Sequence, residues 1–139
     1  MCKKASHVLW ASFLAVALGA LGGCQEYTDK KRAGLLNDTV RMYTSSIRWS
    51  NFESAASAIR PRDDDPVPIS VAHLKGVRVL SHDYQILAAA PDSPEAQMYA
   101  TFTWQPASSA SVQTTSQQAT WWFDEQTQRW FLDGTSMPF

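Results

Sequence analysis

The chain has 139 residues, and its 12 basic and 13 acidic side chains give a formal net charge of -1. This length predicts one domain, and the 45% share of hydrophobic residues predicts a packed core instead of a disordered chain. The near-neutral charge excludes a protein built mainly to neutralise phosphates, so we expect no nucleic-acid partner. The two cysteines, Cys2 and Cys24, are too few for a disulfide framework or a four-ligand zinc site.

Residues 1–23 have the order of an export signal. Two lysines at positions 3 and 4 precede an apolar run over residues 8–18, and small residues follow up to Gly23. The apolar run is shorter than the roughly 20 residues that a membrane-spanning helix needs. Glycines in the last part of the segment each cost about 1 kcal/mol in a helix interior, which argues against a core helix there. The segment is therefore interpreted as a cleaved signal peptide.

The end of this segment, Leu21-Gly22-Gly23-Cys24, resembles the lipobox of bacterial lipoproteins. The resemblance implies that Cys24 receives a diacylglyceryl thioether, that cleavage occurs before it, and that its new amino group is acylated with a palmitate-like chain. Two or more acyl chains hold a protein stably on a membrane, whereas one gives marginal binding. The next residue is Gln25 and not Asp, which by the lipoprotein sorting pattern implies the periplasmic face of the outer membrane. A lipidated Cys24 also leaves no thiol for catalysis in the mature chain.

Residues 24–32 are expected to form a lipidated tether ahead of a single domain over residues 33–139. The basic run Lys30-Lys31-Arg32 lies close to the expected anchor. Two interpretations are open for it: contact with anionic headgroups, at about 1 kcal/mol per charge, or an ordinary solvated helix start.

Helical periodicity follows the tether. Apolar residues recur at spacings of three and four and predict a helix over residues 29–48 that buries one stripe, made of Leu36, Val40, Tyr43 and Ile47. Ser50 and Glu53 then fit a capping box at the start of a second, short helix. We expect that helix to bury Ile59 and to end before Pro61.

The loop after the second helix contains Asp63-Asp64-Asp65, followed by two prolines. A calcium loop needs ligands at alternating positions and a sharp glycine turn, and both are missing here. We therefore expect a solvated, extended connector and no metal site.

The period of the apolar residues changes from helical to two after residue 74. Alternation predicts strands over residues 77–88, 98–104, 112–123 and 130–132, with turns at 91–94 and 124–129. The order of helix, helix and about four antiparallel strands predicts an α+β fold in which N-terminal helices pack on a curved antiparallel sheet.

This layout resembles the nuclear transport factor 2-like, or ketosteroid isomerase-like, cone over roughly residues 30–135. Two motifs carry the resemblance: Arg48-Trp49-Ser50-Asn51-Phe52-Glu53 at the end of the first helix and Trp130-Phe131-Leu132-Asp133-Gly134 in the last strand. A cystatin-like sheet-on-helix fold is the alternative. The family contains enzymes, binding modules and dimerisation domains, so the resemblance alone implies no single function.

Enzymes of this family place an acid or base and hydroxyl donors inside the cone. Five residues have a suitable type, but none aligns with a catalytic position of the family: Tyr43, His73, Asp83, Tyr84 and Tyr99. On a strand, His82 and Tyr84 share a face while Asp83 points away, so these three do not form a relay. No motif for a serine nucleophile or for phosphate binding is present. We expect no catalytic residue and no cofactor.

The aromatic residues of the strands are the remaining functional signal. Strand alternation places Trp121 and Trp122 on opposite faces, so one of them leaves the core or lines a pocket. Two interpretations are open: a ligand cavity or partner surface, and an aromatic core with one exposed ring. The candidate contact residues are Trp104, Trp121, Trp122, Trp130 and Tyr99.

Three functional hypotheses follow from these patterns. The leading one is a lipid-anchored, non-enzymatic envelope protein that binds an envelope protein or a small apolar ligand. The second is an isomerase-like or lyase-like enzyme that uses a buried Asp, Tyr or His. The third is a structural module, for example a homodimer, that supports an envelope complex. The first and third hypotheses differ in the cavity of the cone, which is open if the protein binds a ligand there and filled by Trp and Phe side chains if it is a structural module.

Overall fold

The computed structural model of the chain describes residues 20–88 and 90–139. The expected lysine pair and the apolar run of the export signal lie outside these residues. Within them, no helix combines the length and the apolar character needed to cross a membrane.

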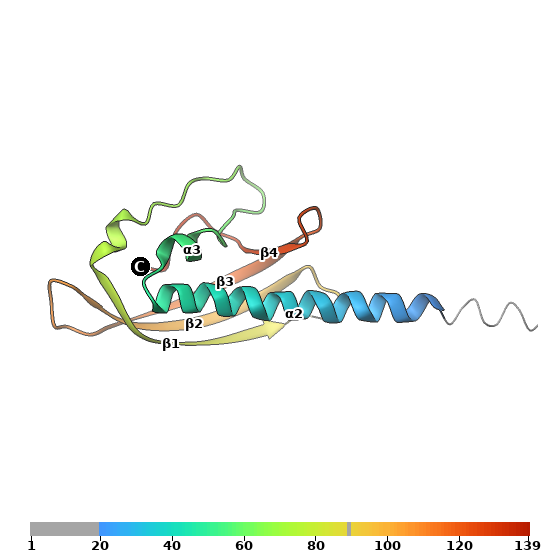
Figure 1. Ribbon diagram of the computed structural model, residues 1–139, viewed down its shortest axis with the longest axis horizontal. Coiled ribbons are helices and arrows are strands. Elements are labelled where there is room, and N and C mark those ends of the chain that lie inside the picture. The colour runs from blue at the N-terminus through green and yellow to red at the C-terminus, as the bar shows by residue number, and fades with distance from the viewer. Residues whose placement is uncertain (1–19, 89) are drawn as a thin grey trace, which may run out of the picture.

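In the described residues, two helices and a 3-10 turn precede four strands (Figure 1). The elements are α2 (Ala20–Arg48), α3 (Phe52–Ala56), η1 (Ala72–Gly76), β1 (Val77–Ala88), β2 (Glu95–Pro106), β3 (Gln113–Asp124) and β4 (Arg129–Leu132). The strands form one antiparallel sheet in the order β1-β2-β3-β4, curled around α2. This confirms the predicted α+β fold with helices packed on a curved antiparallel sheet.

Helix α2 buries the predicted stripe. Leu36, Val40, Tyr43 and Ile47 are all buried against the sheet. The predicted start near residue 29 is wrong, because the helix begins at Ala20 and contains both the expected tether and the glycines before Cys24. A glycine costs only about 1 kcal/mol in a helix, and no proline interrupts this stretch, so the hydrogen-bond ladder continues through it.

The predicted capping box between α2 and α3 is wrong. Ser50 has a φ of 60°, in the left-handed region, and so ends α2 instead of starting α3. The backbone N–H of Ser50 donates to Ile47 at 3.0 Å and that of Asn51 to Ser46 at 2.8 Å, which is the Schellman pattern. Asn51 caps α3, since its Oδ1 accepts from the Ser54 backbone N–H at 3.4 Å.

The second helix is shorter than predicted, ending at Ala56. The next residues leave the helix and run alongside β4: Arg60 N–H donates to the Leu132 carbonyl at 2.9 Å, and Leu132 N–H donates to Ala58 at 2.8 Å. Ile59 is therefore buried as predicted, but in a parallel bridge to Leu132 and not in a helix. This segment covers the free edge of β4.

Alternation along the strands places one face of the sheet in the core. Met98, Ala100 and Phe102 of β2 are buried, and the residues between them face outward. In β1, an irregularity between Val79 and Ser81 shifts the pairing with β2 by one residue, so the alternation of inward and outward side chains changes once there. Helix α2 thus lies in the hollow of the sheet, and the opposite face, on the convex side, stays outside.

Candidate functional site

The hollow of the sheet is filled by aromatic side chains. Tyr43 of α2 and Trp121 of β3 are fully buried, and their rings meet edge to face with centroids 5.5 Å apart. Phe102 is also fully buried and lies nearer the open end. The hollow is therefore a packed core at these positions.

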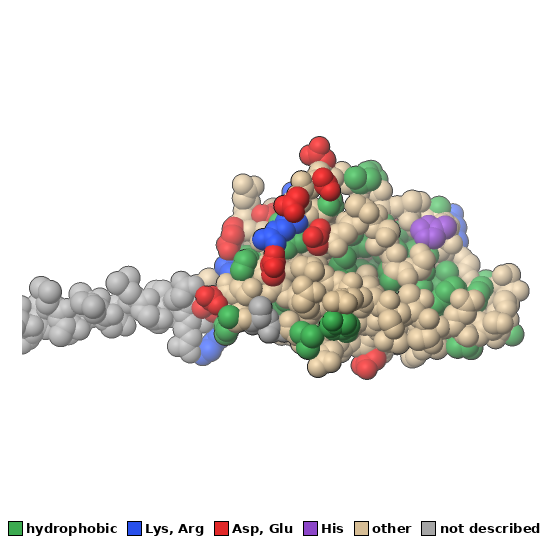
Figure 2. All heavy atoms as spheres, turned by 180° about the vertical axis from the view of Figure 1, so that it is seen from behind, with side chains coloured by type: hydrophobic (Ala, Val, Ile, Leu, Met, Phe, Trp, Pro, Cys, Tyr) green, Lys and Arg blue, Asp and Glu red, His purple; other side chains and the backbone are tan. Residues whose placement is uncertain are grey.

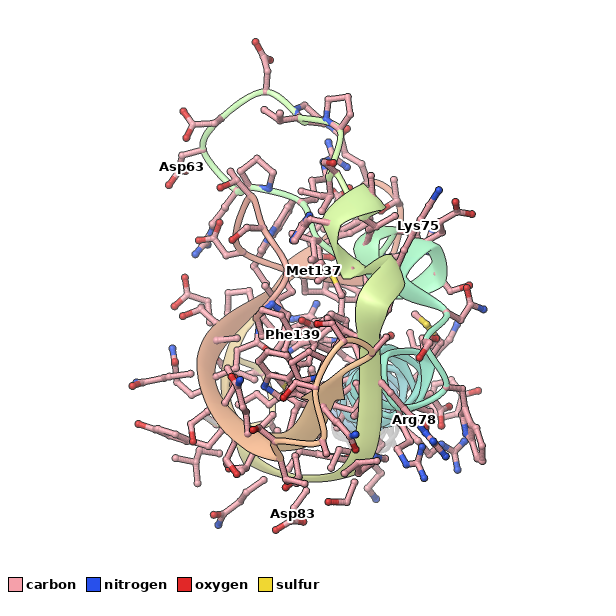
Figure 3. The ribbon with its side chains drawn as sticks, turned by 90° about the vertical axis from the view of Figure 1, so that its left-hand side faces the viewer. Asp63, Lys75, Arg78, Asp83, Met137 and Phe139 are labelled. Atoms are coloured by element: carbon pink, nitrogen blue, oxygen red, sulfur yellow. The ribbon has the colours of Figure 1, made fainter. Side chains whose placement is uncertain are left out.

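The C-terminal segment fills the open end of the curled sheet. Figure 3 looks into this end and shows Met137 and Phe139 inside it. Met137 is buried, and the Phe139 ring packs against Phe102 and Trp104 with centroids 5.6 and 5.5 Å away. The second interpretation of the aromatic strands, a largely aromatic core, fits this arrangement.

The five candidate aromatics separate into two groups. Trp121 and Trp130 are buried in the core, and Trp104 lies half-buried at the open end, its Nε1–H donating to Thr115 Oγ1 at 2.9 Å. Trp122 and Tyr99 lie on the convex side of the sheet, as the register with their core-facing neighbours requires. The structure therefore does not bring the five together in one site.

The Trp122 side chain is engaged in contacts within the chain and is not free to contact a partner. Its Nε1–H donates to the Arg60 carbonyl at 3.0 Å, and its ring packs on Phe131 with centroids 5.5 Å apart. The Arg60 guanidinium carbon lies 5.7 Å from the Trp122 ring and 5.3 Å from the Phe131 ring. Asp124 pairs with Arg60 at 3.5 Å, so an ion pair and a cation–π contact cover this ring.

The remaining convex side carries a surface with almost no charge, which we call the outer face. In the register of β1, β2 and β3, Tyr99 lies between Gln85 and Gln118, and Thr101 lies between Asp83 and Ser116. The outer face consists of Ser81, Asp83, Gln85, Leu87, Gln97, Tyr99, Thr101, Thr103, Thr114, Ser116, Gln118 and Thr120. Leu87, which is 45% exposed, is its aliphatic member.

Hydroxyl and amide groups dominate the outer face, and Asp83 is its one charged member. Tyr99 is 45% exposed near its middle, and Gln97 and Thr120 beside it are hydrogen-bonded at 3.0 Å. The view from behind shows a broad area with few charged side chains, while acidic and basic groups gather toward one margin (Figure 2). Apart from Asp83, the groups that the outer face offers to a partner for hydrogen bonding are therefore uncharged.

The side chains of catalytic type that the sequence offers are not brought together. Tyr43 is inside the core, whereas Asp83 points away from the sheet (Figure 3) and Tyr99 is exposed on the outer face. His73 is exposed on η1. These four residues therefore form no pair of acid and base around a common cavity.

His82 and Tyr84 share a face, as strand alternation predicts. Their rings are parallel, with centroids 6.3 Å apart, and Asp83 between them points the other way. Partial burial and the Arg48 guanidinium lower the pKa of His82, and the Asp83 carboxylate opposes this effect. The net effect on His82 favours its neutral form.

No three side chains of a metal-binding type gather in residues 20–88 and 90–139. The three aspartates at positions 63–65 lie exposed in the connector between α3 and η1. Their exposure and lack of regular structure match the predicted solvated loop.

Arg32 has a different role from both of those considered for the basic run. Its side chain is only 13% exposed: it pairs with Glu125 at 2.7 Å and donates to the Asp92 carbonyl at 3.2 Å. Its guanidinium carbon also lies 4.5 Å from the centre of the Phe123 ring, and Trp130 Nε1–H donates to the Arg32 carbonyl at 3.0 Å. Arg32 therefore fastens α2 to the sheet and is unavailable to a lipid headgroup.

Sequence reasoning missed a surface groove of about 360 Å³ between α3 and η1. Phe52 and Leu74 form its apolar part, and Ser50, Glu53 and Lys75 contribute polar groups. The groove depends on the left-handed turn at Ser50. The sequence pattern around Ser50 predicted a capping box instead of this turn. Trp49 beside that turn is 76% exposed, with the Arg48 guanidinium carbon 4.9 Å from its ring.

Comparisons with known proteins add no relative to this picture: no family model matches the chain, and no curated protein matches it.

Proposed function

We propose that this protein is a lipid-anchored component of a bacterial cell envelope, held through Cys24 on the periplasmic face of the outer membrane. Its domain is a non-enzymatic binding module that contacts an envelope partner through the outer face. The lipobox Leu21-Gly22-Gly23-Cys24 supports the anchor, and the surface chemistry of the sheet supports the contact.

One observation carries the choice among the three hypotheses: the hollow of the sheet is packed with its own aromatic side chains. Tyr43, Phe102 and Trp121 are fully buried there, in the positions that a ligand in an open cone would occupy. This packing favours a partner on the exterior over a small ligand in the cone. It also supports the structural-module hypothesis, in which the partner is a second copy of the chain.

The enzyme hypothesis is the weakest of the three. Tyr43 is the buried acid candidate, and burial raises its pKa to about 12, with the hydrogen bond from Gln117 acting in the opposite direction. A phenol with this pKa is a poor general base near neutral pH. Asp83 and His73 are exposed on different elements, so neither assists it.

The proposed kinship with the nuclear transport factor 2-like cone is supported by the order of elements. A long helix, a short helix and a curled antiparallel sheet follow each other as the resemblance implies. The kinship has no bearing on the outer-face proposal, which stands on the surface residues alone.

The anchor is tested by metabolic labelling with a palmitate analogue in a Gram-negative host, followed by membrane fractionation. We expect the wild-type chain to be labelled and to fractionate with the outer membrane. Cys24→Ser abolishes the labelling, whereas Cys2→Ser, which changes the other cysteine of the chain, keeps it. Equal labelling of the two variants would contradict the assignment of Cys24.

The contact is tested by a photo-crosslinking amino acid at position 99, with position 67 as the control. Tyr99 is 45% exposed on the outer face, and Val67 is 54% exposed on the connector, so both sites are accessible. We expect a discrete adduct in intact cells from position 99 only. An adduct of twice the chain's mass identifies a second copy, and a different mass identifies another partner. The same adducts from both positions, or from neither, would contradict the outer face as the contact.

A further inference from the structure

Strand β1 presents an open edge of the sheet along most of its length (Figure 1). At the start of the strand, Arg48 Nη1 donates to the Val79 carbonyl at 2.7 Å and so covers this edge from α2. From Ser81 to Leu87, the backbone receives hydrogen bonds from β2 alone within residues 20–88 and 90–139. The other side of this segment therefore carries backbone N–H and C=O groups that a further strand can pair.

The open segment of β1, residues 81–87, has few of the features that keep edge strands apart. Natural edges are protected by Lys or Pro, by bulges, by inward-facing charges or by a covering helix or loop. Residues 81–87 contain no Lys, Arg or Pro, and the irregularity between Val79 and Ser81 precedes them. Asp83 is their one acidic side chain, and it points away from the sheet (Figure 3). The segment is thus suited to pairing with another strand.

The inward side chains of the open segment are less buried than their neighbours on β2. Three inward pairs join the two strands: His82 with Phe102, Tyr84 with Ala100, and Ile86 with Met98. The β2 members are at most 2% exposed, whereas the β1 members are only partly buried. Tyr84 and Ile86 pack against the core cluster, so part of the apolar core surface stays open at this edge. A strand added beside β1 would remove that surface from water.

The open segment matches a second copy of itself in one antiparallel register. A continuous sheet needs residues of the same face opposite each other, so the two-fold axis between the copies passes through a residue position. With the axis at Tyr84, the carboxylate of Asp83 lies opposite Gln85, whose amide can donate a hydrogen bond to it. With the axis at Asp83, two carboxylates would repel each other. The axis at Tyr84 also pairs all seven residues of the segment, including Ser81 with Leu87.

We propose that β1 pairs antiparallel with β1 of a second copy of this chain, with the two-fold axis at Tyr84, so that two four-stranded sheets become one continuous sheet. The axis is perpendicular to the sheet, so both copies of α2 lie on one side of it and both outer faces on the other. Tyr99 on β2 stays uncovered. The dimer therefore goes beyond the outer-face contact proposed above and does not depend on it.

Cysteine cross-linking of the full-length chain in membranes of a Gram-negative host tests the pairing and its register. Positions 81 and 87 of opposite copies would have Cα atoms about 4.5–5.5 Å apart, within the range of a disulfide bond. Within one copy, the strand separates these positions by roughly 20 Å, which is too far. Both side chains are exposed, so cysteine there should leave the fold intact.

We expect the double variant Ser81→Cys, Leu87→Cys to form a disulfide-linked dimer on oxidation. Each single variant should form no more dimer than the wild type, which gives the background from Cys2 and Cys24. This difference arises because each single variant places its two cysteines far apart in the dimer.

Sedimentation velocity of the full-length chain in detergent micelles measures the strength of the dimer. Tyr84→Lys places two ammonium groups opposite each other at the axis and should raise the dissociation constant roughly tenfold or more. Thr101→Lys is the matched control, because Thr101 is exposed beside Asp83 but lies one strand away from the edge. We expect this control to keep the wild-type dissociation constant.

Three results would overturn the proposal. They are a wild-type chain that stays monomeric in micelles, equal disulfide-linked dimer from the double and single cysteine variants, and equal weakening by Tyr84→Lys and Thr101→Lys. The last result would move the contact to the outer face. Neither measurement involves position 99, so the outer-face contact can fail while the dimer holds, and the dimer can fail while the outer-face contact holds.

Discussion

Tyr43 of helix α2 and Gln117 of strand β3 join the helix to the centre of the sheet by a two-way hydrogen bond. Gln117 Nε2 donates to the Tyr43 oxygen at 3.1 Å, and the Tyr43 hydroxyl donates to Gln117 Oε1 at 3.2 Å. The two residues are 74 positions apart in the chain, and the Tyr43 side chain is fully buried. This pair fixes the depth at which α2 lies in the hollow.

The alkaline stability of the protein is expected to depend on Tyr43. Burial raises its pKa from 10.0 to about 12, so the unfolded chain loses this proton first as the pH rises. The stability that Tyr43 contributes is therefore full below pH 10 and is lost between pH 10 and 12. The loss is roughly 3 kcal/mol for a shift of about two pKa units, at about 1.36 kcal/mol per unit.

Urea unfolding at pH 9 and pH 11.5 measures this effect, with Tyr43→Phe as the comparison. We expect the variant to lose less stability than the wild type over this interval, because it has no proton to release at position 43. Equal losses in both proteins would show that the pKa of Tyr43 is not raised.

Replacing Ser50 by glycine is expected to stabilise the fold. Ser50 has a φ of 60°, a conformation that glycine adopts without steric cost. Ser50→Gly should raise the unfolding free energy by about 1 kcal/mol in urea. Ser57→Gly is the control, because Ser57 has a φ of -63°, so that glycine there adds flexibility and removes the 2.7 Å hydrogen bond from the Ser57 hydroxyl to the Ser54 carbonyl. A destabilised Ser50→Gly would contradict the left-handed turn.

Loss of the Arg32 side chain should weaken the docking of α2. Arg32→Met removes the 2.7 Å ion pair with Glu125 and the hydrogen bond to the Asp92 carbonyl. We expect a loss of roughly 1–3 kcal/mol in the free energy of unfolding. Arg41→Met is the matched control, since Arg41 and its partner Asp38 are both 71% exposed, and its effect should stay under about 0.5 kcal/mol. Similar effects from both substitutions would indicate that Arg32 lies in solvent.

Introducing a charged side chain tests whether the apolar stripe of α2 is buried. Val40 is fully buried, so Val40→Asp places an unpaired carboxylate in the core and should cost several kcal/mol. Met42, at 37% exposure, is its control on the other side of the helix. Thermal denaturation should show a large decrease in Tm for Val40→Asp and a small one for Met42→Asp.

Asp83 and His73 are expected to contribute little to stability. Both side chains are exposed, so Asp83→Asn and His73→Ala should each change the unfolding free energy by less than about 1 kcal/mol. Urea denaturation measures both. A loss of several kcal/mol in either variant would indicate a buried role and would strengthen the enzyme hypothesis.

Local patterns were enough to predict the inner face of α2 and the strands. The 112–123 run became β3 (Gln113–Asp124), because alternation of apolar and polar residues depends only on near neighbours. The same rule placed His82 and Tyr84 on one face and Asp83 on the other.

Contacts between distant residues could not be predicted in this way. Arg32 looked like part of a basic run, because its partner Glu125 is 93 positions away. The position of Phe139 depends equally on Phe52 and Phe102, which belong to other elements. The prediction of a capping box at Ser50 was wrong because the end of α2, and not the start of α3, sets the backbone conformation of this residue.

The identity of the first residue of the mature protein tests the central proposal most directly. Tandem mass spectrometry of the N-terminal peptide, from protein purified out of the membranes of a Gram-negative host, gives both the cleavage site and the modification. We predict a peptide that begins at Cys24 and carries a diacylglyceryl thioether and an N-acyl chain. A mature peptide that begins elsewhere, or an unmodified Cys24, would contradict the assignment of this protein as an envelope lipoprotein.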